Sequence, residues 1–295
     1  MRMKYITIGL FLPLLLTACT GENPIASLKA GHVHGLAVDQ SNSNRVYIAT
    51  HDGLFTLSGV EGFSPTTDLQ RVGSSRDDFM GFSAHPTNPN VLFSSGHPKS
   101  GGNIGFQRSE DGGETWKKIS NGNPSGPADF HAMLVHPANP NHIYGWYRLR
   151  VHRSLDGGQT WEVLPNQPPE VLSFAGDPKD ANTLYIGTIS DLLVSTDKGA
   201  SWTKTTDAIG YDVIFDIETE PTGTLLLAMR DRGIVRATVG NNGKAILENV
   251  GKLPGGDVPQ HLALDPKNAA TMYVFGKSNA LYKSVDGGKN WQKVL

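Results

Sequence analysis

An eight-residue motif, Ser-x-Asp-x-Gly-x-(Thr/Ser/Asn)-Trp, occurs four times in this chain, each time after a short apolar run. The Asp carboxylate can accept hydrogen bonds from backbone N–H groups two or three residues further on, and the Gly adopts positive φ without steric cost. The Trp then places a large apolar ring under the turn. Four copies of one self-fastened turn predict a repeat protein. The copies are residues 109–116, 154–161, 195–202 and 284–291.

A second repeat consists of an apolar alternating strand, a polar turn that often contains Pro, and another β-rich strand. Its copies recur about every 40 to 50 residues, which is the period of a four-stranded propeller blade. Pro cannot continue a central strand, so it marks the turn between the first two strands of each blade. The chain is therefore predicted to be all-β, a β-propeller of six four-stranded blades. The six copies begin at His34, Met80, His131, Leu172, Phe215 and His261.

The eight-residue motif resembles the Asp-box (BNR) repeat of sialidase-like, sortilin-like and photosystem-assembly-factor-like β-propellers. In those families the box lies on the turn between the third and fourth strands of a blade, on the face away from the active or binding site. The resemblance implies that the motif's Asp and Trp residues are structural. These residues are Asp111, Asp156, Asp197 and Asp286, and Trp116, Trp161, Trp202 and Trp291.

The first residues have the pattern of an export signal. Arg2 and Lys4 precede an apolar run over residues 5–16, which is too short for a comfortable membrane span. Leu-Thr-Ala-Cys at 16–19 resembles the bacterial lipobox, in which the Cys is lipidated and becomes the mature N-terminus. Cys19 is the only cysteine, which suits that role, although an ordinary signal peptide with an incidental Cys is the alternative.

The predicted organisation is a signal peptide at 1–18, a lipidated Cys19 with a tether at 19–30, and a propeller domain at 31–295. A diacylated Cys anchors a protein to a bilayer without spanning it. We therefore expect an extracytoplasmic lipoprotein of the bacterial cell membrane. The net charge of −2 gives no electrostatic case for nucleic acid as a partner.

The propeller prediction sorts the histidines by face. Inner strands begin, and second strands end, at the face that surrounds the mouth of the central channel. In the first three blades, the residue five positions before the turn that ends the inner strand is His34, Met80 or His131. Twelve residues after the same turn they place His51, His97 and Arg148. Together with His32, which shares the strand face of His34, these seven residues are the predicted ligand-binding residues of the mouth.

Three interpretations of this mouth are open. Neutral imidazole and thioether ligands suit copper or another transition metal better than calcium, so His34, His51, Met80, His97 and His131 form a candidate metal set. A metal site predicts that His34, His131 and one of His51 or His97 converge on one point. The mouth could instead be a metal-free polar pocket, or an ordinary water-filled channel. His261 is one residue out of register and is expected to point between blades.

Similar bacterial lipoproteins are usually labelled glycosyl hydrolases, so a sialidase-like glycoside hydrolase acting on extracellular glycans is an alternative function. Sialidases need three Arg residues around the substrate carboxylate, the first of which usually comes from an Arg-Ile-Pro motif. That motif is absent here, and His32-Val33-His34 stands in the corresponding place. No pair of mouth carboxylates is selected as catalytic. The predicted function is therefore a surface-anchored module that binds a glycan or protein ligand at a His-rich mouth, with copper binding as a further alternative.

Overall fold

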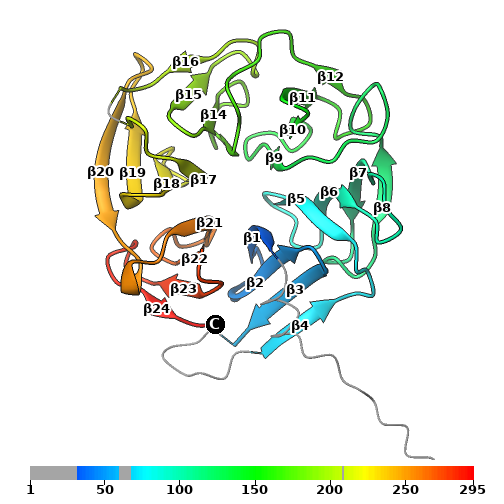
Figure 1. The fold of residues 1–295 in the computed structure, drawn as a ribbon, viewed down its shortest axis with the longest axis horizontal. Helices are drawn as coiled ribbons and strands as arrows, with labels where there is room; N and C mark the ends of the chain where they lie inside the picture. Colours follow the sequence, from blue (N-terminus) through cyan, green and yellow to red (C-terminus); the bar gives the residue numbers. More distant parts are fainter. Residues whose placement is uncertain (1–31, 60–67, 208) are drawn as a thin grey trace, which may run out of the picture.

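The structure is a computed structural model that describes residues 32–59, 68–207 and 209–295. These residues form six antiparallel four-stranded sheets around a central axis (Figure 1). The prediction of a six-bladed, all-β propeller is confirmed. The predicted signal peptide, Cys19 and tether lie outside the described residues. In the part of the chain that is described, no helix is both long and apolar enough to cross a membrane.

Each blade is built from four consecutive strands, and the first of them faces the central axis (Figure 1). Blade one contains β1 (Val33–Asp39), β2 (Asn42–Thr50), β3 (Gly53–Ser58) and β4 (Asp68–Val72). Blade two contains β5 (Asp78–Ala84), β6 (Leu92–His97), β7 (Phe106–Ser109) and β8 (Lys117–Ser120). Blade three contains β9 (Ala132–Val135), β10 (Ile143–Tyr147), β11 (Arg150–Ser154) and β12 (Glu162–Val163).

The second half of the ring has the same strand order. Blade four contains β13 (Ser173–Gly176), β14 (Leu184–Gly187), β15 (Leu192–Ser195) and β16 (Thr203–Lys204). Blade five contains β17 (Ile214–Thr219), β18 (Leu225–Met229), β19 (Gly233–Val239) and β20 (Ala245–Gly251). Blade six contains β21 (Pro259–Leu264), β22 (Met272–Gly276), β23 (Leu281–Ser284) and β24 (Gln292–Lys293). A short 3-10 turn, η1 (Pro254–Gly256), precedes β21.

The hydrophobic core lies between the blades. Six apolar clusters each join two neighbouring blades, and one of them joins blade six to blade one. In that closing cluster Phe275 and Tyr273 of β22 pack with Val46 and Ile48 of β2. Apolar burial therefore closes the ring.

Blade six is complete in itself, because β24 at the end of the chain pairs with β23. The sequence suggests that a strand near residues 26–30 is borrowed to close the ring, but blade six already has its fourth strand in β24. Residues 26–30 lie outside the described residues.

The four motif copies form matching turns between the third and fourth strands of blades two, three, four and six. In the first copy, Ser109 Oγ donates to Asp111 Oδ1 at 2.7 Å, and Thr115 N donates to the same oxygen at 2.9 Å. In this copy the acceptor serves a backbone N–H four residues on, while Asp156 and Asp286 also accept from the N–H three residues on, as predicted. These hydrogen bonds, led by that of the Thr115 hydroxyl, lower the pKa of Asp111 to about 2. The carboxylate is held as a turn fastener.

Polar side chains also join neighbouring blades near the axis. Ser173 Oγ donates to Asp216 Oδ1 at 2.6 Å, and Leu262 N donates to Asp216 Oδ2 at 2.8 Å, so that Asp216 connects blades four, five and six. His261 Nε2 donates to the carbonyl of Val33 at 2.9 Å. His261 therefore bridges blades six and one, which agrees with its expected orientation between blades.

Candidate functional site

Four inner strands, β1, β5, β17 and β21, carry a β-bulge near the mouth of the channel. At each bulge one residue of the inner strand has no partner in the second strand of its blade. These residues are His34, Met80, Phe215 and Gln260. A bulged residue leaves the regular alternation of the strand, so a bulge can redirect a side chain. Each bulged residue lies five residues before the turn residue that ends its inner strand, which is the position singled out in the sequence. In five of the six blades the residue at this position lines a central cavity of about 340 Å³. These residues are His34, Met80, His131, Leu172 and Phe215.

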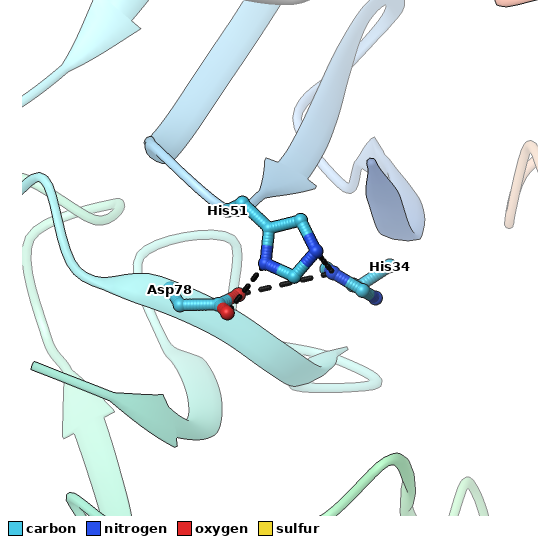
Figure 2. Close-up of side chains that lie close together, drawn as sticks. All are labelled: His34, His51 and Asp78. Atoms are coloured by element: carbon cyan, nitrogen blue, oxygen red, sulfur yellow. Dashed lines mark hydrogen bonds and ion pairs between the residues drawn. The ribbon is translucent and has the colours of Figure 1, made fainter. Parts of the chain in front are cut away.

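His34, His51 and Asp78 meet at the junction of blades one and two (Figure 2), and we call them the first cluster. The Nε2 atoms of His34 and His51 lie 3.1 Å apart. His51 Nδ1 donates to Asp78 Oδ2 at 2.5 Å, and Asp78 Oδ1 lies 3.8 Å from His34 Nε2. His32 adds a third imidazole, whose ring centre is 5.4 Å from that of His51.

The backbone beside Asp78 requires a glycine. Gly96 of β6 has φ of 148°, and a Cβ at this position would overlap the carbonyl oxygen of Asp78. The missing side chain lets β5 and β6 approach closely at the place where Asp78 enters the mouth. Strand packing thus fixes the carboxylate against the imidazole of His51.

The surroundings of His34 favour its neutral imidazole. Burial, reinforced by the neighbouring imidazoles of His51 and His261, lowers the pKa of His34 to about 3. His51 donates its Nδ1–H to Asp78, which leaves the Nε2 lone pair directed at His34. A neutral imidazole nitrogen with its other nitrogen held by a carboxylate is the arrangement found in protein metal sites.

His97, Asp129 and His131 meet at the junction of blades two and three, and we call them the second cluster. Asp129 Oδ2 lies 2.9 Å from His97 Nε2 and 3.0 Å from His131 Nε2. Asp129 is only 4% exposed. The pKa of His131 is raised, mainly because its imidazole donates a hydrogen bond to the carboxylate of Asp129. His97 Nδ1 donates to the carbonyl of Gly102 at 2.8 Å.

The structure therefore divides the predicted mouth residues differently from our expectation. We expected His34 and His131 to converge on one point, but His34 pairs with His51, whereas His131 contacts Asp129, which also contacts His97. Met80 lies in the same cavity lining as His34 and His131. Arg148 joins neither cluster, because its guanidinium lies over the ring of Tyr147, 5.1 Å from the ring centre.

The two aspartates were not singled out from the sequence. The blade register places nine acidic residues near the mouth, and solvated loop acids are common. They are Asp52, Asp77, Asp78, Asp129, Glu170, Asp191, Asp212, Asp231 and Asp257. A signal was present nevertheless, because Asp78 and Asp129 each lie seven residues before the turn residue of their blade, His85 or His136. Their importance follows from the histidines beside them, which belong to neighbouring blades or strands.

Three other arginines near the mouth are paired with carboxylates. Arg76 pairs with Asp52, and Arg232 pairs with Asp212. Arg230 pairs with Asp231. A sialidase clamp needs guanidinium groups that converge on one substrate carboxylate. These side chains instead pair with carboxylates of the protein itself, Arg76 before blade two and both Arg230 and Arg232 in blade five.

Comparisons with known proteins support the fold. No protein-family profile matches the sequence, and no curated protein matches it. Among solved structures, the GH74 enzyme of Niastella koreensis has a TM-score of 0.65 at 17% identity, over 89% of this chain and 45% of that one. The GH74 xyloglucanase of Xanthomonas campestris has a TM-score of 0.60 at 17% identity, over 90% and 45%. YCF48 bound to D1 peptide has a TM-score of 0.54 at 13% identity, over 90% and 82%.

The chain thus spans less than half the length of these two GH74 enzymes. Identities this low show a shared β-propeller architecture. Architecture does not determine chemistry, because propellers with unrelated functions share it. The function must be argued from the two clusters at the mouth.

Proposed function

We propose that this chain is a membrane-anchored, extracytoplasmic β-propeller that binds a copper ion at the first cluster. The observation that supports it is the approach of two imidazole Nε2 atoms, those of His34 and His51, to 3.1 Å. Two nitrogens that bind one ion at about 2.0–2.1 Å in tetrahedral geometry lie roughly 3.3 Å apart. The spacing therefore suits an ion with little movement of either ring.

Copper is favoured by the chemistry of the donors. Imidazole suits copper, zinc, iron and nickel, whereas calcium and magnesium prefer oxygen ligands. Met80 lines the same cavity from the adjacent blade and offers a thioether, a soft ligand that selects Cu(I). Asp78 holds the far nitrogen of His51, as second-shell carboxylates do in metal sites.

Metal analysis tests this proposal. The full chain is purified in detergent without a histidine tag, incubated with copper or zinc salt, desalted and measured by inductively coupled plasma mass spectrometry. We expect at least one copper ion per chain, with imidazole nitrogen in the X-ray absorption spectrum at the copper edge. Calcium and magnesium should not be retained. Protein that retains no copper would overturn the proposal, and zinc retained in its place would assign the site to the wrong ion.

Asp78→Asn is expected to weaken copper binding about 10- to 100-fold, because it removes the carboxylate that orients His51. Asn is close in size to Asp, so the fold should be preserved. Competition with a chromogenic copper chelator measures the change. Asp77→Asn is the matched control, since Asp77 interacts with Ser75 and the backbone of Lys99 rather than with a cluster histidine. An equal loss in both variants would point to general charge rather than orientation.

The membrane anchor is part of the proposal, and Cys19→Ser tests it. We expect the protein to move from the membrane fraction to the soluble extracytoplasmic fraction, because the thiol that would carry the lipid is gone. Immunoblotting of fractionated cells and the intact mass of the purified protein report the change. Unaltered membrane association, with no lipid mass on the wild-type N-terminus, would contradict lipidation at Cys19.

A glycoside hydrolase is supported by likeness of fold alone. Such enzymes usually employ two carboxyl groups, one as an acid and the other as a base or nucleophile. At the mouth, Asp78 and Asp129 are instead held by imidazoles at 2.5–3.0 Å. The geometry therefore favours metal binding over glycan hydrolysis.

A further inference from the structure

The mouth face carries large apolar side chains that the protein does not cover. Among the described residues, six large apolar side chains are exposed, and three of them lie in connections that reach the mouth. Leu149 lies in the β10–β11 turn of blade three and is 69% exposed. Ile189, in the β14–β15 turn of blade four, is 52% exposed, and Tyr211, between blades four and five, is 91% exposed. We call these three residues the apolar rim.

Hydrogen bonds hold two members of the apolar rim at one blade junction. The backbone N–H of Ile214, at the start of β17, donates to the carbonyl of Thr188 at 3.0 Å. The turn that carries Ile189 is therefore held against blade five. Arg230 Nη2 donates to the carbonyl of Tyr211 at 2.9 Å, which holds that connection against the β18–β19 turn. The positions of both exposed residues are thus fixed by the structure of the ring.

The turn that presents Leu149 has a strained backbone. Tyr147 pairs with Arg150, so Arg148 and Leu149 are the two central residues of the hairpin. Both have positive φ, 50° and 59°. Such turns ordinarily contain Asn-Gly or Asp-Gly, because larger residues are strained in the left-handed region. Strain that is retained in order to expose a leucine and an arginine indicates a role for these side chains outside the fold.

The same turn carries positive charge that the protein leaves uncompensated. Arg148 and Arg150 flank Leu149 and are exposed, and no carboxylate of the described residues forms an ion pair with either. By contrast, Arg230 in the corresponding turn of blade five pairs with Asp231. Free arginines attract anionic headgroups, and an apolar side chain between them loses contact with water when it enters the bilayer interface. The composition of the turn therefore suits an anionic lipid surface.

The proposed membrane anchor is attached to the same face. The chain enters the propeller at His32 and β1, and inner strands begin at the mouth. The 13 positions from Cys19 to His32 can span at most about 45 Å. An anchored propeller is therefore tethered to the bilayer by its mouth face, whereas the four motif turns lie on the opposite face.

We propose that the apolar rim and the two arginines of the β10–β11 turn dock onto the surface of an anionic bilayer, so that the propeller rests on its membrane by the mouth face. This inference rests on the anchor in the proposed function and goes beyond it, because a tether alone leaves the orientation of the domain free. The three apolar side chains enter the interface, where tyrosine is favoured. The arginines pair with lipid phosphates. A lipid surface is favoured over a protein partner because the tether brings the bilayer to this face.

Quenching by lipid tests the docking on the full, lipidated chain. Leu149→Cys and Val285→Cys each carry one environment-sensitive fluorophore, since the lipid occupies the thiol of Cys19. Val285 is the matched control, because it is 66% exposed but lies in the motif turn of blade six on the opposite face. The proteins are anchored in vesicles of phosphatidylcholine and phosphatidylglycerol that contain a doxyl-labelled lipid. We expect quenching and blue-shifted emission for Leu149→Cys and neither for Val285→Cys.

Arg148→Gln/Arg150→Gln tests the role of charge, with the fluorophore on Tyr211→Cys. Each arginine near an anionic surface favours the docked state about 5-fold, so the double variant should lower the ratio of docked to undocked protein roughly 25-fold. Lys267→Gln/Lys289→Gln removes the same charge from the opposite face of blade six and should leave the ratio unchanged. An equal loss in both double variants would be an effect of net charge and would overturn the proposed contact.

The outcomes are separable from those of the proposed function. Protein that stays on the vesicles while both fluorophores remain unquenched would overturn docking and leave the anchor and the copper site standing. Equal quenching of both positions would mean that the ring has no preferred face, which also overturns docking. Protein without lipid on Cys19 would overturn the anchor and the docking together, while copper binding is measured independently. Circular dichroism of each labelled variant establishes that the propeller is folded.

Discussion

Gly158→Ala is expected to destabilise the propeller by about 2 to 5 kcal/mol, the sum of strain in the left-handed backbone region and overpacking. Gly158 has φ of +88°, and its added Cβ would lie 2.5 Å from Cδ1 of Phe106 and closer still to Cε1. Phe106 is fully buried on β7 of the preceding blade. The new methyl group would therefore push two blades apart at their apolar interface.

Gly101→Ala is the matched control for Gly158→Ala. Gly101 has φ of +87°, but a Cβ there would meet nothing within 4 Å. Its cost should be only the backbone strain of about 1–2 kcal/mol. Urea unfolding followed by tryptophan fluorescence measures both variants. Equal destabilisation of the two would show that contact with the neighbouring blade adds nothing, and that the motif's glycine serves the turn alone.

This expectation explains why every motif copy has Gly at its fifth position. The equivalent residues Gly113, Gly199 and Gly288 also have positive φ, and a Cβ on each would crowd an apolar side chain. The motif thus combines a local turn with packing between blades. Because both requirements act within one short segment, the turn could be predicted from the motif, whereas the six blades were counted from the second repeat.

The ring of mouth residues was predictable for a related reason. Inner strands are short, and the turn that ends each of them is marked by a repeated pattern, so counting back reaches His34, Met80 and His131. The bulges that redirect two of these residues were not expected, yet they fall at the counted position. Register within a blade is therefore encoded locally.

The pairing of histidines could not be predicted in this way. His51 and Asp78 are 27 residues apart in sequence and belong to different blades. Their contact depends on how far neighbouring blades rotate and on how the connection to β5 folds, and neither is periodic in the sequence. His97 likewise reaches Asp129 at 2.9 Å across the next junction, although the two residues are 32 positions apart. Packing between blades therefore determines which side chains form each cluster.

The second large effect is a loss of copper affinity, which we expect in the variant His34→Ala/His51→Ala. Loss of a second-shell partner alone weakens metal sites about 10- to 100-fold, so removal of both imidazoles should lower the affinity of the first cluster by more than about 100-fold. Competition with a copper chelator at fixed pH measures the affinity. Stabilisation by the ion should fall too, because a ligand at about 100 times its Kd adds roughly 2.7 kcal/mol to the free energy of unfolding.

His85→Asn is the matched control, because it changes a histidine on the opposite face of the ring. His85 Nδ1 accepts hydrogen bonds from the backbone N–H groups of Thr87 and Asn88, and an Asn oxygen can still accept there. The control should keep wild-type copper affinity and the wild-type rise in Tm on addition of copper. If His34→Ala/His51→Ala retained that rise as well, the ion would lie elsewhere, and the first cluster would be a hydrogen-bonded structural element of the mouth. The metal-free Tm values of all three proteins establish that the comparison is between folded propellers.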